Sequence, residues 1–84
     1  MKVVFDQDAW EDYLYWQKAD RKIVQRINAL IKDIQRSPFD GVGKPEGLKH
    51  AMSGYWSRRI TDQHRIVYSI KDDELRIAQL RYHY

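Results

Sequence analysis

The apolar side chains in the first half of the chain recur with the period of an α-helix. Trp10, Tyr13 and Leu14, continued by Gln17, lie at helical spacing between residues 7 and 18. A longer apolar stripe follows, formed by Ile23, Val24, Ile27, Leu30, Ile31 and Ile34. We therefore predict two amphipathic helices, joined by about two residues and folded back on each other as a hairpin.

Residues with capping or helix-stopping chemistry mark the ends of these helices. Asp6 and Asp20 precede the two patterns, and an aspartate at an N-cap can accept hydrogen bonds from the first free backbone N–H groups. The first helix is expected to extend to about Lys18. Ser37-Pro38 ends the second, because proline cannot continue a helix and biases its predecessor away from helical geometry.

Beyond residue 37 the pattern changes to the alternation typical of strands. Residues 37–47 hold three of the four glycines and both prolines, so they are expected to form a loop. Strands are predicted over Lys2–Phe5, Tyr55–Thr61, Arg65–Ile70 and Leu75–His83, and a further short strand near Leu48 is left open. The order β-α-α-β-β-β predicts an α+β fold, with two helices covering one face of a mostly antiparallel sheet. Residues 1–84 are expected to form one domain.

The composition excludes several kinds of site. Without cysteine, the chain has no disulfide, no thiolate nucleophile and no cysteine-based zinc or iron–sulfur centre. No apolar run approaches the roughly 20 residues of a membrane span, and the N-terminus lacks the pattern of a signal peptide. The expectation is a soluble cytoplasmic protein.

The formal net charge of +3 is concentrated in one segment. Residues 1–43 and residues 66–84 each balance their acidic and basic side chains. The excess lies in residues 44–65, with Lys44, Lys49, Arg58, Arg59 and Arg65 against Glu46 and Asp62. A cationic segment in an otherwise balanced domain favours an anionic partner, with nucleic acid the first candidate. Charge alone leaves a merely solvated basic face equally open.

The sequence lacks the common motifs of metal and nucleophile chemistry. His50, His64 and His83 do not have the close spacing of helical zinc motifs, so neither a metal nor another cofactor is expected. No serine stands in a nucleophile elbow. The stretch Gly41–Lys44 lacks the spacing of a phosphate-binding loop and a following helix. The remaining candidate chemistry is metal-free acid–base catalysis on a phosphodiester.

The C-terminal half can supply what RNA cleavage by its own 2′-hydroxyl requires: a base, an acid, and cations for the charged phosphorane. Glu46 is the candidate base, because neighbouring cations favour its ionised form. His83 can transfer a proton near neutral pH. The cations able to bind phosphate are Lys44, Lys49, Arg59 and Arg65.

Simpler structural roles compete with these assignments. A loop carboxylate such as Glu46 is more often merely solvated. Arg58 and Arg59 are adjacent on a predicted strand and point to opposite faces, so one of them is expected to be structural or to bind a partner. His64 suits a turn-capping role, and His83 would ordinarily be a frayed chain end.

Aromatic and apolar residues near the two ends of the chain are expected to pack. We predict that the helix aromatics lie in the core or at an interface; they are Trp10, Tyr13 and Trp16. The predicted anchors of the last strand are Ile77, Leu80 and Tyr82. A strand anchored in this way would allow Tyr84 to stack on a base, although simple packing of Tyr84 is as common.

Five strings of residues, in order along the chain, resemble one known family. They are Asp12–Gln17, Gly43–Glu46 with Leu48–His50, Ser53-Gly54 with Trp56–Ile60, His64-Arg65 with Val67-Tyr68, and the terminal Arg81–Tyr84. One string alone is weak, but together they run nearly end to end. On this basis the chain resembles the YoeB/Txe toxins, which belong to the RelE superfamily of type II toxin–antitoxin systems.

The resemblance implies a microbial ribonuclease-like RelE fold and an endoribonuclease that enters the A site of the 70S ribosome and cuts mRNA there. It also implies a homodimer and silencing by a YefM-like antitoxin. In that family a loop glutamate is the general base, a C-terminal histidine is the general acid, a terminal tyrosine orients substrate, and basic residues surround the phosphate. The matching positions here are Glu46, His83 and Tyr84, with Lys49, Arg59 and Arg65.

One position departs from the family pattern. Members commonly carry proline after the loop glutamate, whereas this chain has Gly47, which loosens the backbone beside Glu46. Two functions therefore stay under consideration: an mRNA endoribonuclease, and a basic ribosome- or RNA-binding module that blocks translation without cutting. The second would need neither Glu46 nor His83. A third possibility is an inactive component of an antitoxin complex.

Overall fold

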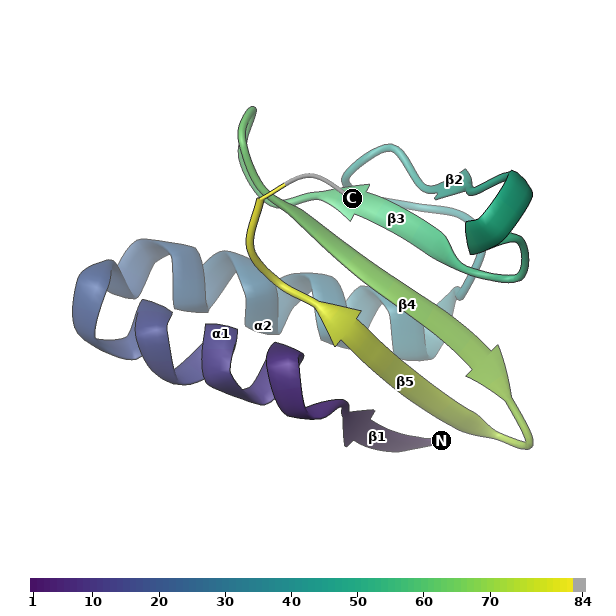
Figure 1. The fold of residues 1–84 in the computed structure, drawn as a ribbon, viewed down its shortest axis with the longest axis horizontal. Helices are drawn as coiled ribbons and strands as arrows, with labels where there is room; N and C mark the ends of the chain where they lie inside the picture. Colours follow the sequence, from purple (N-terminus) through teal and green to yellow (C-terminus); the bar gives the residue numbers. More distant parts are fainter. Residues whose placement is uncertain (83–84) are drawn as a thin grey trace.

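A computed structural model describes residues 1–82, in which two α-helices pack on one face of a five-stranded sheet (Figure 1). The elements are β1 (Lys2–Phe5), α1 (Gln7–Ala19), α2 (Arg21–Arg36), β2 (Glu46–Gly47), the 3₁₀ turn η1 (His50–Met52), β3 (Trp56–Arg59), β4 (Arg65–Lys71) and β5 (Glu74–Gln79). Across the sheet the order is β1-β5-β4-β3-β2. Strand β1 runs parallel to β5, and the other neighbours are antiparallel. The predicted α+β fold is confirmed, and the strand left open near Leu48 is β2.

The ends of α2 follow the predicted capping chemistry. The Asp20 carboxylate accepts a hydrogen bond from the Lys22 backbone N–H at 3.0 Å, and the helix ends at Arg36, shortly before Pro38. Asp6 stands at the N-cap of α1, but its carboxylate makes no capping hydrogen bond and instead pairs with Arg76 at 2.9 Å. The start of α1 was predicted correctly, and the role of the Asp6 side chain was not.

The apolar stripe of α2 forms the centre of the core. The fully buried members of this stripe pack on the inner face of β4 and β5. The fully buried residues of this part of the core include Ile27, Leu30 and Ile34 of α2, Ile66 of β4, and Leu75 and Ile77 of β5. Burying each such side chain contributes roughly 1.5–3 kcal/mol. Helix α1 adds Trp16, which is 5% exposed, whereas Trp10 is 43% exposed. The helix aromatics therefore divide between core and surface.

The last strand is shorter than predicted. It ends at Gln79 rather than reaching residue 83, because contacts with α1 take over at the next residue. The Leu80 N–H donates to the Asp12 carboxylate at 3.0 Å, and the Trp16 indole N–H donates to the Leu80 carbonyl at 2.9 Å. Ile77 and Leu80 are buried anchors as expected, whereas Tyr82 is 59% exposed and is held to β4 through its backbone, whose carbonyl accepts from the Arg65 N–H.

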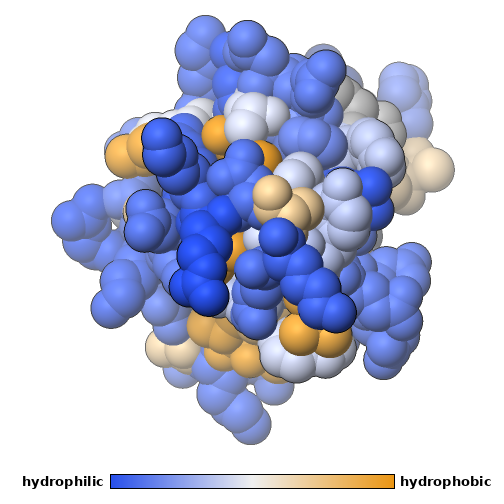
Figure 2. Space-filling view, turned by 90° about the vertical axis from the view of Figure 1, so that its left-hand side faces the viewer, coloured by the Kyte–Doolittle hydropathy of each residue, from blue (hydrophilic) through white to orange (hydrophobic). Residues whose placement is uncertain are grey.

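The surface at the end of the molecule where α1 joins α2 is mostly hydrophilic, with apolar residues in small separate patches (Figure 2). Exposed large apolar side chains of the described chain include Trp10, Leu14, Tyr15, Phe39 and Val42. Neither helix within residues 1–82 is long and apolar enough to cross a membrane.

Candidate functional site

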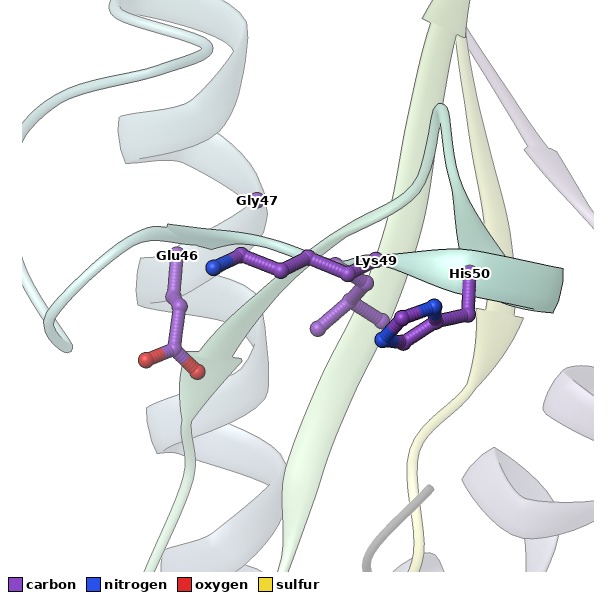
Figure 3. A pocket seen from close by; sticks show the side chains of 5 residues that line it. Glu46, Gly47, Lys49 and His50 are labelled. Carbon is purple, nitrogen blue, oxygen red and sulfur yellow. The ribbon is translucent and has the colours of Figure 1, made fainter.

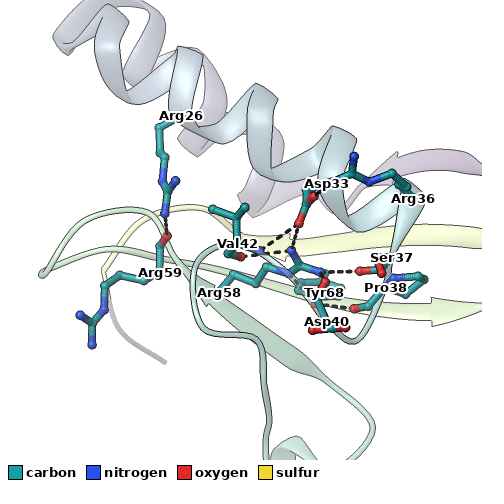
Figure 4. A network of polar contacts seen from close by, with 10 residues as sticks. All are labelled: Arg26, Asp33, Arg36, Ser37, Pro38, Asp40, Val42, Arg58, Arg59 and Tyr68. Carbon is teal, nitrogen blue, oxygen red and sulfur yellow. Dashed lines mark hydrogen bonds and ion pairs between the residues drawn. The ribbon is translucent and has the colours of Figure 1, made fainter.

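The strand register brings three predicted site residues to one face of the sheet. Arg58 reaches Asp33 of α2, so it points to the helix side, and the neighbouring Arg59 points to the opposite, open side (Figure 4). In the antiparallel ladders Arg59 is paired with Arg65, and Glu46 of β2 is paired with Ser57 of β3. Directly paired residues share a face. Glu46, Arg59 and Arg65 therefore lie on the open face.

Ser57 of β3 lies between the strand of Glu46 and the strand of Arg65. The Arg65 guanidinium donates a hydrogen bond to the Ser57 hydroxyl at 3.2 Å, and Glu46 stands directly opposite Ser57 on the next strand. Ser57 itself is fully buried. Ser57 was not among the site residues predicted from the sequence. Its position two residues before Arg59, and therefore on the same face, was the signal that could have found it.

Arg59 and Arg65 form a cross-strand pair of like charges. Like charges directly opposed on one face of a sheet repel each other. Arg59, which is 40% exposed, approaches Asp62 at 3.9 Å, but that carboxylate is 98% exposed and the contact is weak. Each guanidinium group suits the oxygens of a phosphate, because it offers several donors in a fixed plane.

The segment from Glu46 to His50 forms an open hollow beside this face (Figure 3). Glu46, Lys49 and His50 are exposed, and the Lys49 side chain extends back along the segment toward Glu46. His50 has a backbone φ of +60°, in the left-handed region that residues other than glycine rarely adopt. Strained backbone of this kind is often found at functional sites. No local pattern in the sequence predicts this conformation.

Lys44 lies in the preceding loop, exposed, and outside the residues that line the hollow. Its backbone is also left-handed, with a φ of +54°. The predicted cations therefore lie in three places: Lys44 in the loop before β2, Lys49 beside Glu46, and the two arginines on the open face of β3 and β4.

Gly47 fits the short hairpin between β2 and β3. The Leu48 N–H donates to the Tyr55 carbonyl at 2.9 Å, so in the alternating antiparallel pattern the Gly47 N–H points away from β3. A proline here, as in many members of the resembled family, would cost no ladder hydrogen bond. A β-carbon on Gly47 would lie 3.6 Å from the Trp56 ring, an ordinary contact distance. The position tolerates glycine but does not require it.

Arg58 is a buried structural residue, and the predicted division between the two arginines is confirmed. Each of its guanidinium nitrogens donates a hydrogen bond (Figure 4). The acceptors are the Tyr68 hydroxyl, the Asp33 carboxylate, and the carbonyls of Ser37, Asp40 and Val42. Arg58 therefore fixes the loop that leads from α2 to Glu46. The sequence placed Arg58 in the basic segment. Because Arg58 is buried, it does not contribute to a basic surface.

Asp33 is the anionic partner in this network. Hydrogen bonds from the Val42 N–H and from Arg58, together with the ion pair to Arg36, lower the pKa of Asp33 from 3.8 to about 2. Burial raises the pKa of the neighbouring Tyr68 hydroxyl, which donates to the Pro38 carbonyl at 2.7 Å. Asp33 therefore stays ionised over the physiological range, and Tyr68 stays protonated.

The chain end that follows β5 lies against the turn between β3 and β4. The His64 N–H donates to the Thr61 hydroxyl at 3.1 Å, which closes the turn, and the His64 ring accepts a hydrogen bond from the Tyr82 N–H at 2.7 Å. The Arg81 guanidinium stacks on the Tyr15 ring, 3.6 Å from its centre. The two predicted site residues His83 and Tyr84 lie outside the described residues. Within residues 1–82, no group of histidine and acidic side chains is arranged to hold a metal ion.

Comparison with known proteins agrees with this architecture. Residues 5–84 match the family model described as YoeB-like toxin of bacterial type II toxin–antitoxin system. The chain belongs to the YoeB toxin family. Toxin YoeB of Escherichia coli (strain K12) and Toxin YoeB of Streptomyces coelicolor are each 60% identical to it over 84 residues, and both alignments span this chain completely. Both relatives are also covered completely.

Solved structures extend the similarity to the YoeB fold itself. A YoeB/ParE toxin from Agrobacterium tumefaciens superposes with a TM-score of 0.98 at 49% identity, and both chains are covered completely. The toxin in a heterotetrameric YoeB–YefM complex from Staphylococcus aureus gives a TM-score of 0.93 at 46% identity, covering 100% of this chain and 98% of that one. The expected RelE-type fold is confirmed by these neighbours.

Proposed function

We propose that this chain is a ribosome-dependent mRNA endoribonuclease that cleaves by metal-free acid–base chemistry and thereby inhibits translation. The observation that carries the proposal is the register of the sheet. It pairs Glu46 with Ser57 and Arg59 with Arg65 on the same open face, where the Arg65 guanidinium donates a hydrogen bond to the Ser57 hydroxyl. Membership of the YoeB family supports the same function.

In the proposed reaction the Glu46 carboxylate accepts the proton of a ribose 2′-hydroxyl, and the 2′-oxygen attacks the adjacent phosphorus. Arg65 and Arg59 stabilise the negative charge that develops on the phosphorane oxygens. The bond from phosphorus to the 5′-oxygen breaks, and His83 donates the proton that this oxygen takes up. The products are a 2′,3′-cyclic phosphate and a 5′-hydroxyl. Tyr84 orients the substrate, and Lys44 and Lys49 bind the flanking phosphates.

The partners follow from the family. We propose that the chain acts in the cytoplasm, enters the A site of the 70S ribosome, and is silenced by a YefM-like antitoxin. A disordered acidic segment of that antitoxin would fold over the basic face. The proposed homodimer has a candidate surface on α1, where Trp10 and Leu14 are exposed one helical turn apart.

Single-turnover kinetics on programmed ribosomes test the chemical assignment. A placed acid or base contributes roughly 10²–10⁴-fold to a rate, so Glu46→Ala and His83→Ala should each lower the cleavage rate by at least about 100-fold. Ribosome affinity should change little. Glu11→Ala, which removes an exposed carboxylate of α1, is the control and should cleave like the wild type. Losses below about tenfold at both Glu46 and His83 would refute the roles.

A non-cleaving binder is the second candidate. The opposed pair Arg59 and Arg65 favours it, because these cations can hold a phosphate without any proton transfer. A binder would keep its inhibitory effect in both Glu46→Ala and His83→Ala. The enzyme would lose its effect in both variants.

A further inference from the structure

His64 joins two segments that are distant in sequence. It lies in the turn between β3 and β4, and its Nδ1 accepts a hydrogen bond from the Tyr82 N–H at 2.7 Å. Its ring packs edge-on against Trp16 of α1, with centroids 4.8 Å apart, and in a tilted arrangement against the Tyr82 ring, with centroids 5.4 Å apart. The imidazole is therefore held between the helix layer and the chain end.

The Tyr82 backbone adopts a conformation that needs such support. Its φ of +63° lies in the left-handed region, which is unfavourable for a residue with a β-carbon. The Tyr82 carbonyl accepts hydrogen bonds from the Arg65 N–H and from the Gln79 amide, each at 3.2 Å. The His64 ring holds the other side of the same residue, through its N–H. Tyr82 is thus fixed on both sides immediately before the peptide bond to His83.

The hydrogen bond from the Tyr82 N–H to the ring can form only when His64 is neutral. Neutral imidazole has one nitrogen with a free lone pair, whereas imidazolium carries a hydrogen on both and cannot accept. Partial burial lowers the pKa of His64, the positive charge of Arg81 lowers it further, and Asp12 of α1 opposes them. Asp62 and Arg65 flank His64 on its own turn. The balance favours the neutral acceptor at physiological pH.

We propose that His64 is a positioning residue, whose neutral ring fixes the Tyr82 backbone and so sets the place from which His83 enters the reaction. This rests on the proposed function, because it requires His83 to act as the acid. His64 touches neither substrate nor reacting atoms in this role. Arg65 links the same anchor to the phosphate site, since its backbone binds the Tyr82 carbonyl while its guanidinium reaches Ser57.

Two variants distinguish the effect of the hydrogen-bond acceptor at position 64 from the effect of the volume of the ring. In His64→Asn the side-chain oxygen takes nearly the place of Nδ1, so it can accept from the Tyr82 N–H and does not titrate. His64→Leu fills a similar volume without an acceptor. If the leucine variant failed to fold, the asparagine variant would still distinguish a fixed acceptor from a titrating one.

The first measurement is independent of activity. Hydrogen exchange of the Tyr82 amide is followed by NMR on the full chain from about pH 5 to 8, together with the ring nitrogen shifts of His64. A hydrogen bond of this kind can protect an amide by up to about tenfold. In the wild type that protection should disappear as His64 takes up its proton, in His64→Asn it should persist across the range, and in His64→Leu it should be absent. The proposal is overturned if protection of the Tyr82 amide does not change when His64 is protonated, or if it persists in His64→Leu.

The second measurement is single-turnover cleavage on programmed ribosomes. A misplacement of about 1 Å can cost on the order of 100-fold in rate, so His64→Leu should cleave at least about tenfold more slowly with unchanged ribosome affinity. His64→Asn should stay within about threefold of the wild type. Cleavage by His64→Leu at the wild-type rate overturns the positioning role. No cleavage by the wild type refutes the proposed function instead, and the exchange data still decide whether His64 anchors Tyr82.

Discussion

Replacing Arg58 by methionine removes the link between α2, β3 and the loop that leads to Glu46. The wild-type side chain is completely buried and ties Asp33 to the carbonyls of Ser37, Asp40 and Val42. Methionine fills much of the same space but donates no hydrogen bond. The variant therefore leaves a nearly buried carboxylate without its buried cation, and leaves loop carbonyls without their donor.

The magnitude follows from this geometry. Breaking a buried ion pair by removing one partner costs about 3–5 kcal/mol. The total stability of a small domain is on the order of 5–10 kcal/mol, so the change removes a large fraction of it. At about 4–8 °C per kcal/mol for a domain of this size, the melting temperature should fall by at least about 12 °C.

The assay is urea and thermal denaturation followed by circular dichroism, with Arg59→Met as the matched control. Arg59 is adjacent in sequence, lies on the open face and makes only a weak ion pair, so its replacement should cost less than about 1 kcal/mol. Arg58→Lys keeps the charge but loses the planar fork, and should fall between the two. Equal losses at positions 58 and 59 would refute the structural role assigned to Arg58.

Three further predictions concern Asp33 of α2 and the glycines at positions 41 and 47, on and beside the same loop. The pKa of Asp33 is lowered in the folded state, so its contribution to stability is present above the ordinary value of 3.8 and is lost as the pH falls through about 2. Urea midpoints measured from pH 5 to 2 should show this loss, and Asp33→Asn should flatten it; an unchanged profile in that variant would contradict the assignment. Gly47→Ala should raise stability by up to about 1 kcal/mol, because the new methyl group meets only the Trp56 ring. Gly41→Ala should lower stability, because φ is +120° and the methyl group would collide with the Asp33 carboxylate; the same sign for both glycines in parallel urea denaturation would show the local geometry to be wrong.

The sequence predicted well those features that depend on neighbours in the chain. Asp20 and Pro38 determine the ends of α2, because capping and proline geometry act within a few residues. The hydrophobic stripe likewise identified the buried side of α2. Strand alternation alone predicted that the side chains of Arg58 and Arg59 point to opposite faces of the sheet.

The features that the sequence could not supply depend on contacts between distant residues. Which of the two arginines is buried is decided by Asp33, 25 positions away. The early end of β5 results from the contacts of Leu80 with Asp12 and Trp16 on α1, which no local pattern reveals. The place of Ser57 between Glu46 and Arg65 depends on the pairing of three strands.

The central claim is that this chain cuts message on the ribosome, and primer extension on mRNA from expressing cells tests it most directly. The wild type should produce discrete new 5′ ends at codons, and Glu46→Ala, expressed at the same level, should produce none. Intact message with stalled protein synthesis in the wild type would contradict the claim and would favour the non-cleaving binder.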